Sequence, residues 1–385
     1  MQKVTNTKKI TKLKNGNSID MPLLITVLVL LALGIVMVLS ASAPSALAEL
    51  GDSYRYLKTQ GIAAIIGIGA MLFFSIVAYQ KYRKYYKIIY LISIAVLFTV
   101  LIPGIGLEIN GARRWIQIVG LRIQPSEITK IGLIIFYAGY FTDRNNKLDT
   151  LKGSTIIPII ALAIPIGILL LVQNHMSAGI VMAFVTLIII LMSGCQLKYY
   201  TWLFCGGIAS LVMIFPFIKD KLIGSFRSDR IEAWLHPQEN SVGTAYQTLQ
   251  GLYAIGSGGL FGVGLGQSKQ KYLYIPEAHN DFIFAILAEE LGFVGCALIL
   301  VLFAMFTVRG VLIAIRASDM FGSLIAIGIT ALIAVQAILN IAVVTNTIPN
   351  TGISLPFLSY GGTSLIILLV SVGILLNISR SAKKI

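Results

Sequence analysis

Long apolar runs divide the chain into regular intervals, and they constrain its fold more than any other feature. Each run is close to the length, about 20 residues, that a helix needs to cross the hydrocarbon of a bilayer. The runs are continuous rather than alternating, which argues against a β-barrel. They cover 22–44, 61–78, 88–103, 126–142, 155–172, 178–194, 199–218, 282–308, 321–345 and 357–377. Only 12% of the residues are charged, whereas soluble domains carry about 25%, so a soluble protein is excluded. The sequence therefore predicts an all-α, polytopic integral membrane protein with about ten transmembrane helices.

Lysine and arginine are unevenly distributed between these runs. The two terminal tails and the connections on their side of the membrane hold eighteen of them. The short connections on the other side hold five, which are Arg55, Lys58, Arg113, Arg114 and Arg122. Because basic residues are retained in the cytoplasm, we expect cytoplasmic tails at 1–20 and 379–385, flanking a membrane domain at 21–378. The net charge of +14 then reflects topology, and binding of nucleic acid is not expected.

Two connections on the outer side are long. One covers 104–125, and the other is a large extracellular loop at 219–280, between the seventh and eighth spans. The large loop mixes polar residues with Trp234, Leu235, Tyr246 and Tyr253. This mixture predicts helices that lie on the membrane surface.

Ionisable residues in or beside hydrocarbon are the best functional candidates, because it is unfavourable to place them there. The first cluster contains Arg113, Arg114 and Trp115, followed by Glu127 and Lys130 at the start of the fourth span. Arginine and lysine side chains could bind the phosphates of a lipid head group. Alternatively, the arginines contact ordinary lipids, Trp115 anchors the chain at the interface, and Glu127 pairs with Lys130.

The second cluster lies where the eighth span begins. It contains Glu277, His279 and Asp281, with Glu289 and Glu290 further along. A helix that begins near residue 276 would put Glu277 and Asp281 on one face. An aspartate at the boundary between water and hydrocarbon suits a general base, because desolvation raises its pKa. The alternative is an acidic group that complements the helix dipole.

The third cluster is a polar segment rich in Gly and Pro at 346–364, which includes Ser359. Irregular backbone at membrane depth is tolerated only inside protein or beside a watery cavity, so we expect this segment to line the same outer cavity. A glycine-rich stretch at 256–266 has neither the Lys-Ser/Thr of a P-loop nor a preceding strand. Lone histidines at 175 and 236 lack metal-ligand spacing, so the sequence identifies no metal ligands.

Together, these clusters resemble the SEDS family (shape, elongation, division and sporulation) of FtsW, RodA and SpoVE. The resemblance rests on Gly-Ala-Arg-Arg-Trp-Ile at 111–116, Gln-Pro-Ser-Glu at 124–127, Pro-Glu-Ala-His-Asn-Asp-Phe-Ile-Phe at 276–284 and the segment 352–362. It implies a peptidoglycan glycosyltransferase that polymerises lipid II at the outer face of the bacterial cytoplasmic membrane and releases undecaprenyl pyrophosphate. The family's essential aspartate corresponds to Asp281. Two positions depart from the common pattern, Asn280 and the His175 segment, and the latter is closer to the FtsW/SpoVE branch.

The resemblance also implies a site and partners. Asp281 is the expected base, with substrate contacts from Arg113, Arg114, Trp115, Glu127, Lys130, Lys271, Glu277, His279 and Ser359. A divalent cation, Mg or Mn, is an alternative source of positive charge at the pyrophosphate. The expected partners are a class B penicillin-binding protein and the division or elongation machinery. Two other functions stay open, a lipid II flippase and a non-catalytic scaffold that recruits a transpeptidase.

Overall fold

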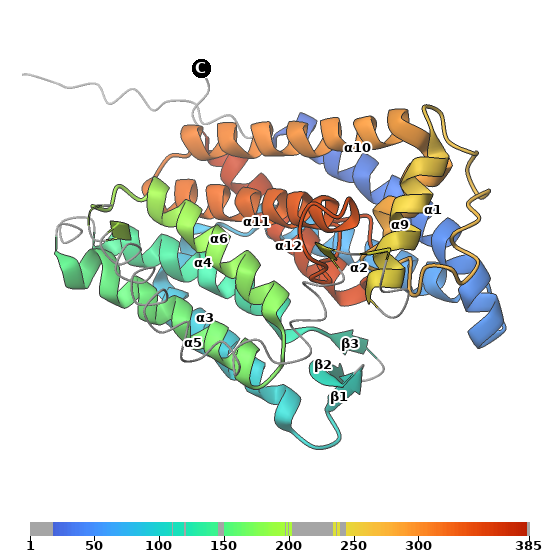
Figure 1. Ribbon diagram of the computed structural model, residues 1–385. Coiled ribbons are helices and arrows are strands. Elements are labelled where there is room, and N and C mark those ends of the chain that lie inside the picture. Colours follow the sequence, from blue (N-terminus) through green and yellow to red (C-terminus); the bar gives the residue numbers. More distant parts are fainter. Residues whose placement is uncertain are drawn as a thin grey trace, which may run out of the picture.

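A computed structural model describes residues 18–109, 111–118, 121–144, 150–196, 198, 200–201, 234–235, 237–238 and 244–382. Within these ranges the chain is mainly helical, as expected (Figure 1). The long helices are α1 (Met21–Leu50), α2 (Arg55–Ile76), α3 (Gln80–Phe98), α4 (Pro125–Asp143), α5 (Ile157–Leu171), α6 (Met176–Met192), α9 (Thr244–Gly258), α10 (Ile283–Arg316), α11 (Met320–Val344) and α12 (Gly362–Ser381). A turn of 3-10 helix (Thr99–Leu101) extends α3, and a π-helical turn (Lys152–Ile156) precedes α5.

Nine of the predicted spans coincide with described helices. Seven of these are long and apolar enough to cross a membrane, namely α1, α2, α3, α5, α10, α11 and α12, with α3 and α5 counted with their adjoining turns. The helix α6 is shorter, at 17 residues. The predicted span at 199–218 lies outside the described residues, apart from Tyr200 and Thr201. The described helices therefore support a protein that crosses the membrane several times.

Helix boundaries follow from local chemistry. Asp20 precedes α1, and its Oδ1 accepts a hydrogen bond from the Leu23 amide at 3.0 Å, which satisfies a free N–H of the first turn. Gly51 ends α1 in a left-handed conformation that suits glycine. Asp319 caps α11 in the same way, because its Oδ1 accepts from the Gly322 amide at 2.7 Å.

The helices pack in pairs that define a central core. The helix α2 packs on α12, α3 on α4, and α10 on α11, while α1 lies along α10 (Figure 1). The helix α11 is the most buried of the candidate spans, whereas α3 exposes Ile88, Leu91 and Ile92. In a membrane protein, exposed side chains of this kind face lipid. The helix α11 therefore lies in the interior of the bundle, where α4, α6, α10 and α12 pack against it.

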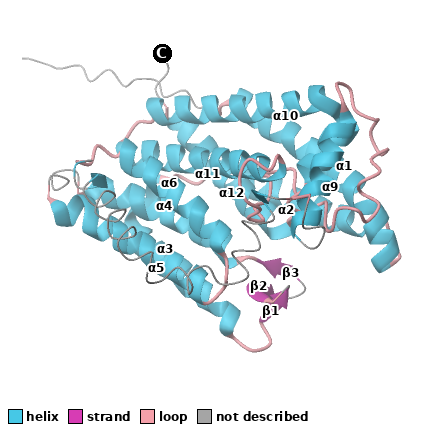
Figure 2. Ribbon diagram, viewed as in Figure 1, coloured by secondary structure: helices cyan, strands magenta, loops and turns pink. Residues whose placement is uncertain are grey.

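A small sheet was not predicted. The outer segment at 104–125 forms β1 (Gly106–Ile109), β2 (Ala112–Ile118) and β3 (Leu121–Ile123), paired in antiparallel order (Figure 2). Glu108 is opposite Arg113, and Gln117 is opposite Arg122. The strands are too short for an apolar run to reveal them, and their β-branched and aromatic residues favour extended backbone.

The helix bundle has two ends, and polar contacts link helices to each other at the first of them. At one end, called here the Asp20 end, Arg309 forms an ion pair with Asp20, and the Asp20 amide donates to Ser379 Oγ at 3.0 Å. The other end, called here the Asp281 end, contains the starts of α4, α6, α10 and α12 together with the sheet. Most of the predicted site residues fall at this second end.

The helix α10 is broken at Gly292, whose φ of 64° and ψ of −164° are not helical. The glycine-rich loop 259–264 replaces the missing helical hydrogen bonds. The Val263 amide donates to Glu289 O at 2.9 Å, and the Phe293 amide donates to Gly259 O at 2.9 Å. A Cβ on Gly292 would lie 2.3 Å from the Gly262 nitrogen, so the approach requires glycine. The glycine-rich stretch is therefore a packing element of α10.

Candidate active site

The segment that carries Asp281 is a series of turns rather than a helix. The helix α10 begins at Ile283, close to the predicted start of the eighth span at 282. The condition of a helix from residue 276 is therefore not met, and Glu277 and Asp281 do not share a helical face. Glu277 has a left-handed backbone, with φ of 47°, which interrupts any helix. Its Oε2 accepts a hydrogen bond from Asn280 Nδ2 at 2.9 Å, which closes the turn. Glu277 therefore shapes the approach to Asp281.

The segment 346–361 lies directly beside Asp281, and the outer cavity that both are expected to line stays a prediction. A Cβ built on Gly352 would be 3.5 Å from Asp281 Oδ2, so the carboxylate lies beside the backbone of this segment, within reach of one added methyl group. Ser359 stabilises the segment, because its Oγ accepts from the Leu355 amide at 2.7 Å. Gln60 of α2 donates to Ser359 O at 3.3 Å and accepts from the Gly361 amide at 3.2 Å. These contacts give Ser359 a structural role, and its predicted contact with substrate stays untested.

His279 is held in an aromatic cluster two residues before Asp281. Its ring centroid is 4.2 Å from that of Tyr56 and 5.6 Å from that of Tyr360. Its carbonyl accepts from the Tyr360 amide at 2.9 Å. Burial lowers the pKa of His279 to about 4, so the ring is neutral at pH 7. Its Nδ1 is buried without a hydrogen-bond partner, which leaves an acceptor or donor for a further group.

The basic residues of the sheet differ in their partners. Arg113 is exposed and pairs with Glu108 on β1, with 3.1 Å between Nε and Oε2. Arg114 points the other way, and its Nη2 donates to Asn174 O at 2.6 Å. Trp115 is half-buried and opposite Leu107 on β1. Arg114 therefore joins the sheet to the segment that precedes α6, while Arg113 faces outward.

Lys130 forms an ion pair with Glu127, the alternative to a contact with substrate, with 2.6 Å between Nζ and Oε1, and its side chain is only 3% exposed. His175, at the start of α6, lies close enough to be affected by both Arg114 and Lys130. Its pKa is lowered to about 3, first by burial and then by these two positive charges. Ser177, two residues further on, donates to Thr351 O. A chain of contacts thus runs from the basic residues to the segment beside Asp281.

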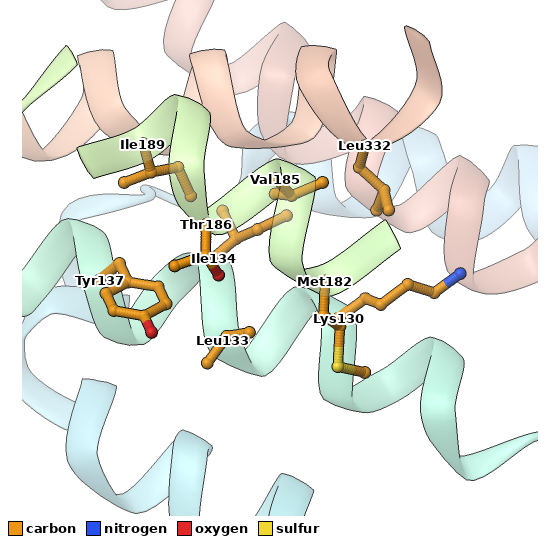
Figure 3. A pocket seen from close by; sticks show the side chains of 9 residues that line it. All are labelled: Lys130, Leu133, Ile134, Tyr137, Met182, Val185, Thr186, Ile189 and Leu332. Carbon is orange, nitrogen blue, oxygen red and sulfur yellow. The ribbon is translucent and has the colours of Figure 1, made fainter. Parts of the chain in front are cut away.

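A narrow apolar pocket extends inward from Lys130, between α4, α6 and α11 (Figure 3). Figure 3 shows the Lys130 amino group pointing away from Tyr137 and Ile189, which lie at the far side of the pocket. The other lining residues are Leu133, Ile134, Met182, Val185, Thr186 and Leu332. Lys130 therefore places its charge toward the Asp281 end and its aliphatic stem along the pocket.

Lys271, Glu289 and Glu290 form a separate buried cluster. Lys271 Nζ lies 2.9 Å from Glu290 Oε1, and these side chains are 4% and 0% exposed. Ser40 of α1 donates to Glu290 Oε1 at 2.6 Å. Glu289 accepts from the Lys269 amide at 2.9 Å and from Ser268 Oγ. This ion pair gives Lys271 a structural partner, and the predicted contact of Lys271 with substrate stays untested.

The described ranges contain no group of three His, Cys, Asp or Glu side chains placed to hold a metal ion. Asp281 is the acidic group nearest the 346–361 segment in the contacts given above, and the carboxylates of Glu127 and Glu290 are engaged by lysines. These described residues do not form a cage for Mg or Mn.

Comparison with known families covers almost the whole chain. The model of the FtsW/RodA/SpoVE family, described as "Cell cycle protein", matches residues 21–384. The chain belongs to the FtsW/RodA/SpoVE family. It is 41% identical over 364 residues to stage V sporulation protein E of Bacillus subtilis, covering 94% of this chain and 98% of that one. It is also 41% identical over 365 residues to the probable peptidoglycan glycosyltransferase FtsW of Trichlorobacter lovleyi, covering 94% of both. The family resemblance seen in the motifs is thereby confirmed.

Solved structures agree with the fold of this family member. One belongs to a study of a peptidoglycan synthase complex that coordinates polymerization and crosslinking; it matches with a TM-score of 0.78 at 24% identity, over 94% of this chain and 98% of that one. A variant of the rod shape determining protein RodA from Thermus thermophilus matches with a TM-score of 0.68 at 25% identity, over 95% and 99%. The predicted helical membrane fold is therefore confirmed, whereas the number of spans and the side on which the termini lie stay predictions.

Proposed function

We propose that this chain is a peptidoglycan glycosyltransferase that polymerises lipid II at the outer face of the bacterial cytoplasmic membrane, with Asp281 as general base. The observation that carries the proposal is the position of Asp281, whose carboxylate lies beside Gly352 where an irregular segment enters the helix bundle. The names of the FtsW relatives support the type of reaction. Arg114, His175 and Lys130 support a site that continues from Asp281 toward positive charge.

The reaction needs one base and one stabiliser of negative charge. The 4-hydroxyl oxygen of the acceptor GlcNAc attacks the anomeric carbon of the donor, and its proton passes to the Asp281 carboxylate. A new C–O bond forms at that carbon while its bond to the pyrophosphate oxygen breaks, and undecaprenyl pyrophosphate leaves with the electron pair. Arg113, Arg114 and Lys130 supply positive charge for this leaving group. Lys130 must then leave Glu127 for the pyrophosphate, or bind Glu127 and the pyrophosphate at the same time.

The same proposal includes a partner. One solved relative comes from a peptidoglycan synthase complex, which supports a class B penicillin-binding protein as the crosslinking partner of this chain. The division or elongation machinery would direct the pair to its site of action. Polymerisation is therefore best measured with the purified chain alone and again with such a partner.

The test replaces Asp281 with asparagine and measures polymerisation of lipid II. We expect the rate to fall about 10²–10⁴-fold, the range that a general base contributes. Asp52→Asn is a matched control, because Asp52 is another aspartate beyond the end of α1 and pairs with Lys58 in a largely exposed ion pair. Near-normal polymerisation by a folded Asp281→Asn protein would contradict the role of base. Transport of lipid II without polymer would favour the flippase, and recruitment of the partner without either activity would favour the scaffold.

A further inference from the structure

Asn340 is a buried amide in the last two turns of α11, with apolar residues on both sides of it in the sequence. Its side chain is 0% exposed. Its Nδ2 donates to Asp281 O at 2.7 Å and to Ile353 O at 2.6 Å. Both hydrogens of the amide are thus used on two backbone carbonyls from different segments. One of these carbonyls belongs to the residue that carries the proposed base, and the other follows Gly352.

These two bonds are part of a larger ring of contacts around Asp281. Gln247 of α9 donates through Nε2 to Pro276 O at 3.1 Å, and Asn350 Nδ2 donates to Gln247 Oε1 at 3.4 Å. The Gly352 amide donates to Asn350 Oδ1 at 3.1 Å. The ring therefore joins α9, the turn before Asp281, the segment 350–353 and α11. Asn340 anchors this ring to α11.

A carboxylate that removes a proton must lie within hydrogen-bond distance of the reacting hydroxyl, and a displacement of about 1 Å can lower the rate about 10²-fold. The turn that carries Asp281 and the segment that carries Gly352 are both irregular, so helical hydrogen bonds do not fix their separation. Asn340 bonds both of them at once. This one side chain therefore links the backbone of Asp281 directly to the segment that lies beside its carboxylate.

We propose that Asn340 is a positioning residue for Asp281, which holds the carboxylate against the segment 350–353 in the geometry needed for proton removal. This inference rests on the proposed role of Asp281 as base. Asn340 acts through the Asp281 backbone rather than through the substrate. Loss of its amide therefore lowers kcat and leaves KM nearly unchanged, because the groups that bind lipid II keep their places.

Asn377 offers a matched control within the same chain. It is also a buried asparagine on a central helix, and it also bridges two backbone groups of another segment. Its Nδ2 donates to Ser75 O at 2.8 Å, and its Oδ1 accepts from the Tyr79 amide at 3.0 Å. It lies near the C-terminal end of α12, at the Asp20 end of the bundle, whereas Asp281 lies at the opposite end. Removal of either amide leaves buried backbone groups unpaired, so both replacements reduce stability.

The experiment compares Asn340→Leu with Asn377→Leu in the full chain, assayed with lipid II and the crosslinking partner. We expect Asn340→Leu to lower kcat about 10²-fold with little change in KM, and Asn377→Leu to retain most of kcat. A second series places Asn340→Leu in the Asp281→Asn background. There we expect no further loss, because residues that act as a unit are strongly non-additive.

Each outcome bears on a different statement. If folded Asn340→Leu keeps the parental kcat, or loses as much as Asn377→Leu, or adds its full effect to Asp281→Asn, the positioning role is wrong. A rise in KM alone would also overturn it. If Asp281→Asn itself is active, the base is wrong whatever Asn340 does. Should Asn340→Leu not fold, Asn340→Asp retains the shape of the side chain without the NH₂ donors, and the same loss of kcat is expected.

Discussion

The buried ion pair between Lys271 and Glu290 allows a quantitative prediction. Both side chains are almost fully buried, and Glu290 also accepts hydrogen bonds from Ser40 Oγ and the Ser268 amide. Replacing Lys271 with methionine leaves a buried carboxylate without its counter-charge. Removal of one partner of such a pair reduces stability by about 3–5 kcal/mol. The two remaining donors soften the effect, so we expect about 3 kcal/mol for Lys271→Met.

The double variant Lys271→Met/Glu290→Gln should recover most of this loss. Removal of both charges avoids desolvation of a lone ion, and exchanges of this type are often neutral. Lys58→Met is the matched control, because Lys58 pairs with Asp52 at 2.8 Å but with exposed side chains. An exposed pair contributes about 0–1 kcal/mol, and salt screens it further.

The measurement is the free energy of unfolding in mild detergent. It compares four proteins, which are the parent, Lys271→Met, Lys58→Met and the double variant Lys271→Met/Glu290→Gln. A loss for Lys271→Met no larger than that for Lys58→Met would refute the reasoning, as would a double variant less stable than Lys271→Met. The activity of the double variant addresses a separate prediction. A stable but inactive protein would support a contact between Lys271 and substrate, and an active one would contradict it.

Two further predictions concern the surroundings of Asp281. Gly352→Ala should lower the rate of polymerisation about tenfold or more, because its φ of +64° strains an alanine and the new methyl group would occupy space in van der Waals contact with Asp281 Oδ2. Gly51→Ala is its control, since Gly51 has a similar φ of +70° and open space around it, and equal activities would contradict the prediction. The second prediction is that the free energy of unfolding falls by up to about 1.4 kcal/mol per pH unit as the pH falls from 6.5 toward 4. Burial lowers the pKa of His279 to about 4 in the folded chain, so the unfolded chain binds the proton first. Unfolding of His279→Phe across this pH range should show a smaller slope, and an unchanged slope would exclude His279 as its source.

The membrane helices could be predicted because their signal is local. An apolar run of the length of α11 has no other stable form in a bilayer, and nine such runs became helices. The sheet could not be predicted in this way. Its strands are short, and their pairing of Glu108 with Arg113 depends on turns rather than on the apolar pattern. The shared face considered for Glu277 and Asp281 does not form, because Glu277 adopts a left-handed backbone that is uncommon for glutamate and cannot be predicted from it.

The site was predictable where charge marks it. Asp281, Lys130 and Glu127 stand out from an apolar background. The last two form the ion pair that was the alternative to their predicted contacts with substrate, and those contacts stay predictions. Asn340 was missed because an amide carries no charge and its partner Asp281 is 59 residues away. Ser40 was missed for the same reason, since it is 250 residues from Glu290. Contacts of this range depend on the packing of helices, which no local pattern encodes.

The contacts at the Asp20 end have a consequence for the synthesis of the chain. Asp20 precedes the first helix, yet its partners Arg309 and Ser379 lie 289 and 359 residues later. The first helix therefore enters the membrane long before the groups that fix its start exist. Asp20 must stay at the water interface until α10 and then α12 are inserted, because a lone carboxylate is unstable in hydrocarbon. The contact between Asp20 and Ser379 can form only after α12 is inserted, so a chain that stops before α12 lacks this link between its first and last helices.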